Sequence, residues 1–127
     1  MPGGMAELCQ RAWRLAGASE TYRIGMIEVL AYSVPGGFLE PHVDAVYGHA
    51  VIISVGATAH FWWSSAAHTE RKVVELRSGD AVVFPSSLAA AVKHGITHFE
   101  PGTTPSWMSK EHARICVQYR EELPHQG

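Results

Sequence analysis

From residue 23 onward the chain consists of short segments of β-forming residues separated by closely spaced turn residues. Val, Ile, Tyr, Phe and Trp are concentrated in the segments, and Gly, Pro, Ser and Asp lie between them. Eight short strands with frequent turns predict a mainly β fold of two facing sheets, the jelly roll or double-stranded β-helix. The predicted strands are 23–33, 38–44, 50–55, 59–64, 72–76, 81–84, 89–94 and 112–120.

Two of the turns are predicted to close hairpins. One contains Pro35-Gly36-Gly37, and the other is the segment 77–80 with its Gly-Asp pair. Proline, glycine and aspartate each favour tight turns between strands. We therefore expect the strands on either side of each turn to pair.

One helix is predicted before the strands, at about 5–17. Its apolar residues recur at the spacing of a single helical face, and Gly17 is a suitable stop. We expect this face to pack against the outside of a sheet. The whole chain, 1–127, is then one domain, with the jelly-roll core at about 22–120. The residues of the apolar face are Met5, Leu8, Cys9, Ala12, Trp13 and Ala16.

Composition narrows the class of protein. With 127 residues and 46% hydrophobic residues, the chain is long enough and apolar enough for one packed core. A net charge of -2 argues against a strongly basic nucleic-acid surface. No segment has the length of a membrane span or the pattern of a signal peptide, so we expect no membrane partner.

The two cysteines, Cys9 and Cys116, do not form the pattern of a disulfide framework. Two free thiols suit an intracellular, reducing compartment, without distinguishing cytoplasm from nucleus. The sequence does not determine the oligomeric state.

A candidate metal site begins at His42 and Asp44. In a strand, alternate side chains face the same way, so these two project together while Val43 faces away. Two histidines and one carboxylate form the facial triad that binds Fe(II) and leaves positions open for a co-substrate and O2. The pair therefore needs a second histidine from a distant strand.

His94 is the first candidate for the third ligand. It follows an apolar segment and shares a strand face with Val92, which suits an inward position. His98 is the alternative, although it falls in a predicted loop. His60, beside a run of aromatic residues, is expected to pack or to cap a strand end.

The last predicted strand carries Arg114 and Arg120. They are six residues apart, so both lie on one face of a continuous strand, with Cys116 between them. Inward guanidinium groups are costly without an anion, and each can bind a carboxylate through two hydrogen bonds. The pair suits a dicarboxylate ligand, and acidic side chains at a barrel rim are the alternative partner.

Taken together, these motifs resemble the AlkB-like branch of the 2-oxoglutarate- and Fe(II)-dependent dioxygenases. The resemblance rests on His42-x-Asp44, His94-Gly95-Ile96 and Arg114-x5-Arg120, in that order. The segment 73–85 is similar to the strand pair that precedes the distal histidine in that family. Tyr32, ahead of the Pro-Gly turn, is similar to a family tyrosine.

The resemblance implies a set of roles. Fe(II) would be bound by His42, Asp44 and His94. Arg114, assisted by Tyr32, would bind the distal carboxylate of the co-substrate 2-oxoglutarate. Arg120 would lie near its iron-chelating end. With O2 as second co-substrate, the family hydroxylates a C–H bond, and when that carbon is bonded to nitrogen the result is demethylation.

The substrate is left open. A methylated nucleobase or nucleic acid is the first expectation, and a protein or small-molecule substrate is the alternative. The chain departs from the nucleic-acid repair enzymes of the family in having one helix before its core and Cys116 between the arginines. Two alternatives belong to other functional classes. One is a non-catalytic jelly-roll binding module, and the other is a cupin-like metalloenzyme that does not use 2-oxoglutarate.

Overall fold

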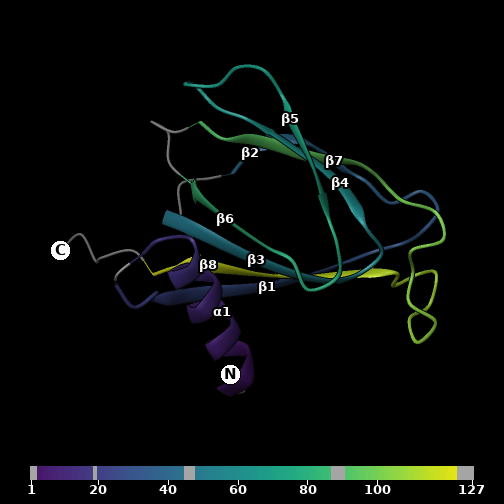
Figure 1. Cartoon of the computed structure of the whole chain (residues 1–127), viewed down its shortest axis with the longest axis horizontal. Coiled ribbons are helices and arrows are strands. Elements are labelled where there is room, and N and C mark those ends of the chain that lie inside the picture. Colours follow the sequence, from purple (N-terminus) through teal and green to yellow (C-terminus); the bar gives the residue numbers. More distant parts are fainter. Residues whose placement is uncertain (1–2, 19, 45–47, 87–90, 123–127) are drawn as a thin grey trace.

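The computed structural model describes residues 3–18, 20–44, 48–86 and 91–122. Within these residues, two four-stranded sheets lie face to face and the helix α1 lies on the outer side of one of them (Figure 1). The elements are α1 (Gly3–Leu15), β1 (Ile24–Tyr32), β2 (Leu39–Val43), β3 (Gly48–Gly56), β4 (Ala59–Ser64), β5 (Lys72–Leu76), β6 (Ala81–Ser86), β7 (Lys93–Phe99) and β8 (Arg114–Glu121).

The strand order identifies the architecture. In the first sheet the order is β1-β8-β3-β6, and in the second sheet it is β2-β7-β4-β5. The pairs formed by the described strands are antiparallel. Two facing antiparallel sheets and one helix confirm the predicted jelly-roll fold class.

Both predicted hairpins are wrong. β1 pairs with β8 and β2 pairs with β7, so the turn after β1 carries the chain from the first sheet to the second. Similarly, β5 belongs to the second sheet and β6 to the first. Turn residues reverse the chain equally well within one sheet and between two facing sheets, so local sequence did not distinguish these outcomes.

One predicted strand is misplaced. Of the predicted strand 89–94, residues 91 and 92 are not in a strand and residues 93 and 94 begin β7, which spans Lys93–Phe99; residues 87–90 lie outside the described residues. Gly95 is therefore inside a strand, where a Cβ atom would come within 3.0 Å of the Trp62 indole nitrogen. His98 consequently lies in β7 and not in a loop.

Among the described residues, the buried apolar side chains form two clusters. One fills the space between the sheets around Phe61, Ile96 and Phe99. The other lies between α1 and the outer face of the first sheet, around Cys9, Val51 and Tyr119. This second cluster confirms the prediction that the helix packs against a sheet. No helix among the described residues is long and apolar enough to cross a bilayer.

Candidate metal centre

His42, Asp44 and His94 lie together at one end of the space between the sheets. β2 and β7 are neighbours, and His42 is directly opposite His94 in their register. Asp44 Oδ1 lies 3.0 Å from His42 Nε2 and 3.7 Å from His94 Nε2. One ligand atom from each residue falls within 4.8 Å of the other two. The structure thus brings together the three residues predicted from the sequence.

The two imidazoles lie in different environments. His94 is buried against the rings of Phe61 and Phe84. Burial lowers the pKa of His94, which outweighs the opposing effect of the nearby Asp44 carboxylate. His42 Nδ1 lies 2.9 Å from the Glu40 carbonyl, and its Nε2 lies 3.0 Å from Asp44 Oδ1. Two imidazoles and one carboxylate are a donor set that fits Fe(II).

Arg120 connects this group to the first sheet. Its Nη1 donates to Asp44 Oδ2 over 2.7 Å, and its Nη2 donates to Gln118 Oε1 over 3.1 Å. Glu28 lies 3.6 Å from Nε. One oxygen of Asp44 is therefore held by Arg120 while the other faces the histidines. Arg120 thus lies beside a candidate metal ligand, and it has the acidic partners that were the alternative expectation for this arginine.

Arg114 is almost completely buried, with 1% of its surface exposed. Its guanidinium donates to the carbonyls of Ala57 and Leu76 over 2.7 and 3.0 Å and to Ser54 Oγ over 2.6 Å. Its Nε has no hydrogen-bond partner among the described residues. No carboxylate of the described residues forms an ion pair with Arg114. A buried cation without an anion is costly, so this environment favours a carboxylate ligand.

A small cavity of about 20 Å³ lies between the sheets and is lined by residues of both features. His94 lines it at the metal end, and Arg114 and Tyr32 line it further along the barrel. Cys116 also lines this cavity. Burial raises the pKa of Tyr32 to about 12, so its hydroxyl stays protonated and can donate to a carboxylate. One candidate metal ligand, His94, therefore shares this cavity with a buried cation and a phenol donor.

The other candidate histidines lie elsewhere. His98 is exposed in β7 and is not among the three metal-ligating side chains around Asp44. His60 lies beside Glu75 and Glu100 in a second group of possible metal ligands. Sequence analysis missed this second group, because the pairing of β4 with β5 that creates it is not visible in the sequence.

The tandem tryptophans face opposite ways, as strand alternation predicts. Trp62 is buried under the guanidinium of Arg71, which lies 3.9 Å from the ring centroid. Trp63 is half-buried, packs against the core and is opposite His94 in the register of β4 and β7. Trp63 is therefore the tryptophan that lies beside the candidate metal centre.

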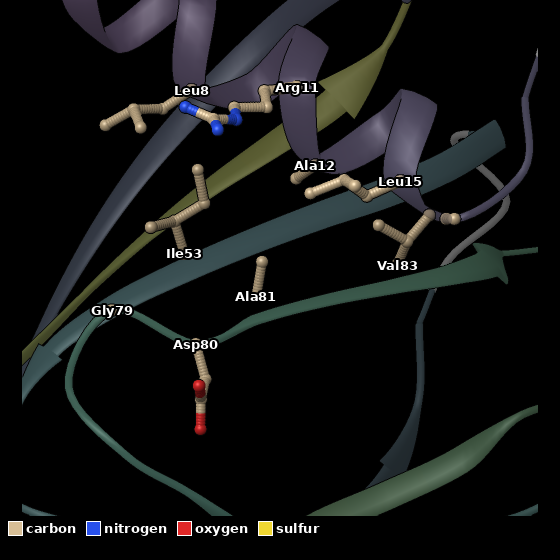
Figure 2. A pocket seen from close by; sticks show the side chains of 10 residues that line it. Leu8, Arg11, Ala12, Leu15, Ile53, Gly79, Asp80, Ala81 and Val83 are labelled. Carbon is tan, nitrogen blue, oxygen red and sulfur yellow. The ribbon is translucent and has the colours of Figure 1, made fainter.

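A larger hollow lies on the outer side of the first sheet, between α1 and the strands β3 and β6. Figure 2 shows the side chains of Leu8, Leu15, Ile53 and Val83 around it, with Asp80 pointing away from the helix. Its described lining contains no group of three metal-ligating side chains. The candidate metal ligands His42, Asp44 and His94 are thus not in this hollow.

Comparisons with known proteins place this geometry in context. A family model described as the 2OG-Fe(II) oxygenase superfamily matches residues 1–120. No curated protein matches the chain. A solved structure described as OsALKBH1 has a TM-score of 0.71 and 20% sequence identity, covering 95% of this chain. The match covers 66% of that chain, so the present chain spans about two thirds of its length.

Two further structures are more distant. Hydroxypropylphosphonic acid epoxidase from S. wedmorenis, in complex with fosfomycin, has a TM-score of 0.46 and 11% identity, covering 74% of this chain and 41% of that chain. An RmlC-like cupin protein from Desulfovibrio desulfuricans has a TM-score of 0.41 and 13% identity, and the match covers 84% of this chain and 95% of that chain.

Proposed function

Because the chain belongs to the 2OG-Fe(II) oxygenase superfamily, we propose that it is an Fe(II)- and 2-oxoglutarate-dependent dioxygenase that hydroxylates a C–H bond. The cofactors of this superfamily are Fe(II), 2-oxoglutarate and O2. One observation carries the proposal: His94, a member of the His42, Asp44 and His94 group, lines the same cavity as the buried guanidinium of Arg114. A dicarboxylate that chelates a metal at one end needs this combination of partners.

Each residue has a stated task in this proposal. His42, Asp44 and His94 would hold the iron, and Arg120 would fix the orientation of Asp44. Arg114 would bind the distal carboxylate of 2-oxoglutarate, with the protonated Tyr32 as a second donor.

When bound, Fe(II) with 2-oxoglutarate and O2 supplies the oxidation of the substrate C–H bond. Phe61 and Ile96 form apolar walls of the cavity, which exclude water from the reacting groups.

For the substrate, we propose a methylated nucleobase, free or in a nucleic acid, which would be demethylated at nitrogen. Trp63 offers a ring beside His94, and Lys72 Nζ lies 5.5 Å from the centroid of that ring. Lys93 is exposed on the neighbouring strand. An aromatic ring with cations around it suits stacking of a base and contact with phosphate. A protein or small-molecule substrate is the alternative, favoured by the net charge of -2.

The cofactor part of the proposal is tested by adding Fe(II) and then 2-oxoglutarate to the purified protein without oxygen. We expect the visible charge-transfer band of a chelated Fe(II)–ketoacid complex. Asp44→Asn and Arg114→Gln should each remove the band, with circular dichroism as the control for folding.

Other results would contradict this proposal. Iron binding without a band would favour a cupin-like metalloenzyme, and binding of neither partner would favour a non-catalytic module. If the band forms, 2-oxoglutarate consumption with methylated nucleosides, oligonucleotides and peptides distinguishes the substrates.

A further inference from the structure

We propose a second divalent-cation site, on the outer face of the second sheet, formed by His60 of β4, Glu75 of β5 and Glu100 directly after β7. One imidazole nitrogen and one oxygen from each carboxylate lie within 4.8 Å of one another. This site goes beyond the proposed oxygenase function and does not depend on it. Its preferred ion, from one nitrogen and two oxygen donors, is Zn²⁺ with water completing the coordination.

Strand pairing explains why these side chains meet. His60 is directly opposite Glu75 in the register of β4 and β5. The pairing of β4 with β7 shifts between Ala59 and Phe61, so His60 lies at an irregularity of the ladder. Such bulges change the direction of a side chain. Because Phe61 lines the cavity between the sheets, His60 is on the opposite, outer face.

The third ligand is held by its backbone. The Glu100 amide donates to the Thr58 carbonyl over 2.8 Å, and the Glu100 carbonyl accepts from Thr103 Oγ1 over 2.6 Å. Thr103 Oγ1 also accepts from the Thr58 amide over 2.9 Å. These bonds fix the residue next to the start of β4, so the Glu100 carboxylate can reach His60 and Glu75.

The electrostatics of the group favour a cation in addition to Arg77, whose Nη2 lies 4.0 Å from Glu75 Oε2. His60 Nε2 is buried and has no hydrogen-bond partner among the described residues. Two carboxylates lie beside it, yet no ion pair of 4.0 Å or less joins His60 to either within the described part of the chain. A buried polar atom without a partner is costly, and neighbouring carboxylates repel each other. A cation between them relieves both costs.

The distances between the three ligand atoms also suit a bound ion. Zinc lies about 2.0–2.2 Å from nitrogen and oxygen ligands, so two ligands of one ion are roughly 3.3 Å apart. Small rotations of the two glutamate side chains would close the present spacing. The imidazole of His60 is braced by the ring of His98, which stacks on it with centroids 4.1 Å apart and an interplanar angle of 15°.

This cation would have a structural effect. It would connect the edge strand β5 to β4 and to the end of β7. Along β4, His60 is three residues from Trp63, the neighbour of His94, which corresponds to about 10 Å. The two sites are therefore separate, and occupancy of one does not require the other.

The test is equilibrium dialysis of the metal-stripped full chain against Zn²⁺. We expect two equivalents in the natural sequence and one in His42→Ala, because zinc also occupies the first site. Glu75→Gln and Glu100→Gln should each weaken the second equivalent at least tenfold and keep the anaerobic Fe(II)–2-oxoglutarate band. Glu111→Gln, at an exposed glutamate outside the group, is the matched control and should bind like the natural sequence.

A second measurement distinguishes loss of the cation site from loss of folding. In the His42→Ala background, Zn²⁺ should raise the melting temperature, and Glu75→Gln should remove that rise. The proposal is overturned if the natural sequence binds one equivalent that His42→Ala abolishes. It is equally overturned if both glutamate variants bind zinc as tightly as the Glu111→Gln control.

Discussion

At the scale of the residue, Arg114 has the sharpest expected effect. Replacing it with Lys keeps the charge and removes the planar arrangement of donors that binds a carboxylate in two places. Losing charge-assisted hydrogen bonds of about 1.5–3 kcal/mol should weaken 2-oxoglutarate binding by about 10- to 100-fold. Iron affinity should not change, because the hydrogen bonds of Arg114 go to Ala57, Leu76 and Ser54 and not to the proposed metal ligands.

The dissociation constant is measured by anaerobic titration of the Fe(II)–ketoacid band. Arg77→Lys, at an exposed arginine, is the control and should leave the constant unchanged. Equal affinities in Arg114→Lys and the control would contradict the assignment of Arg114 to the co-substrate.

His94 gives a prediction for the pH dependence of the metal-free protein. Burial lowers its pKa from 6.5, so on acidification the unfolded chain takes up this proton before the folded chain does. The contribution of His94 to the free energy of unfolding should be constant well above about pH 6.5 and should fall below it. Urea unfolding at about pH 7.5 and about pH 5.5 should show a smaller change in His94→Gln than in the natural sequence. Equal changes would show that His94 does not drive the effect.

Some of these residues were predictable because the relevant geometry is local. The alternation of a single strand places His42 with Asp44, and Arg114 with Arg120. The partner of the first pair, His94, depends on the register of β2 and β7, which the sequence alone did not determine. The same limit applies to His60, which was expected to pack or to cap a strand end. Its ring does stack on that of His98, but the two glutamates beside it were not predicted.

At the scale of the element, β7 was the strand that sequence analysis placed worst. Glycine normally weakens a strand, so Gly95 was taken as its end. In the structure this glycine makes room for the indole of Trp62, and the strand continues to Phe99. A long-range contact between two strands therefore overrides the local signal.

Gly95→Ala tests this packing. The added Cβ would lie 2.9 Å from the Leu39 carbonyl oxygen and 3.0 Å from Trp62 Nε1, so β7 has to shift next to His94. Overpacking of this kind costs about 1–3 kcal/mol, measured as the free energy of unfolding in urea. We also expect weaker Fe(II) binding, because the shift displaces a ligand. Gly79→Ala, whose Cβ would meet nothing within 4 Å, is the control for space, although its φ of +90° adds strain of its own.

At the scale of the whole molecule, the candidate site spans both sheets. The three proposed iron ligands come from β2, the residue after it and β7, on the side of the second sheet, whereas Arg114 and Arg120 come from β8 of the first sheet. The sequence predicted the two facing sheets from the number of strands and turns. It did not predict which strands are neighbours, as both mistaken hairpins show, because pairing between distant segments leaves no local pattern.

This arrangement predicts that metal and 2-oxoglutarate stabilise the fold together. A ligand that chelates the metal at one end and binds Arg114 at the other would bridge the two sheets. With Mn²⁺ bound as a redox-stable substitute, 2-oxoglutarate at 100 times its dissociation constant should add about 2.7 kcal/mol of stability. For a chain of this length, that corresponds to a rise in melting temperature of about 10 °C. Without metal, the same concentration should produce almost no rise, because one of the two attachment points is missing.

Arg114→Lys should keep the rise caused by Mn²⁺ and lose most of the rise caused by 2-oxoglutarate. An equal rise with and without metal would show that the dicarboxylate binds elsewhere, and the bridge between the sheets would have to be abandoned.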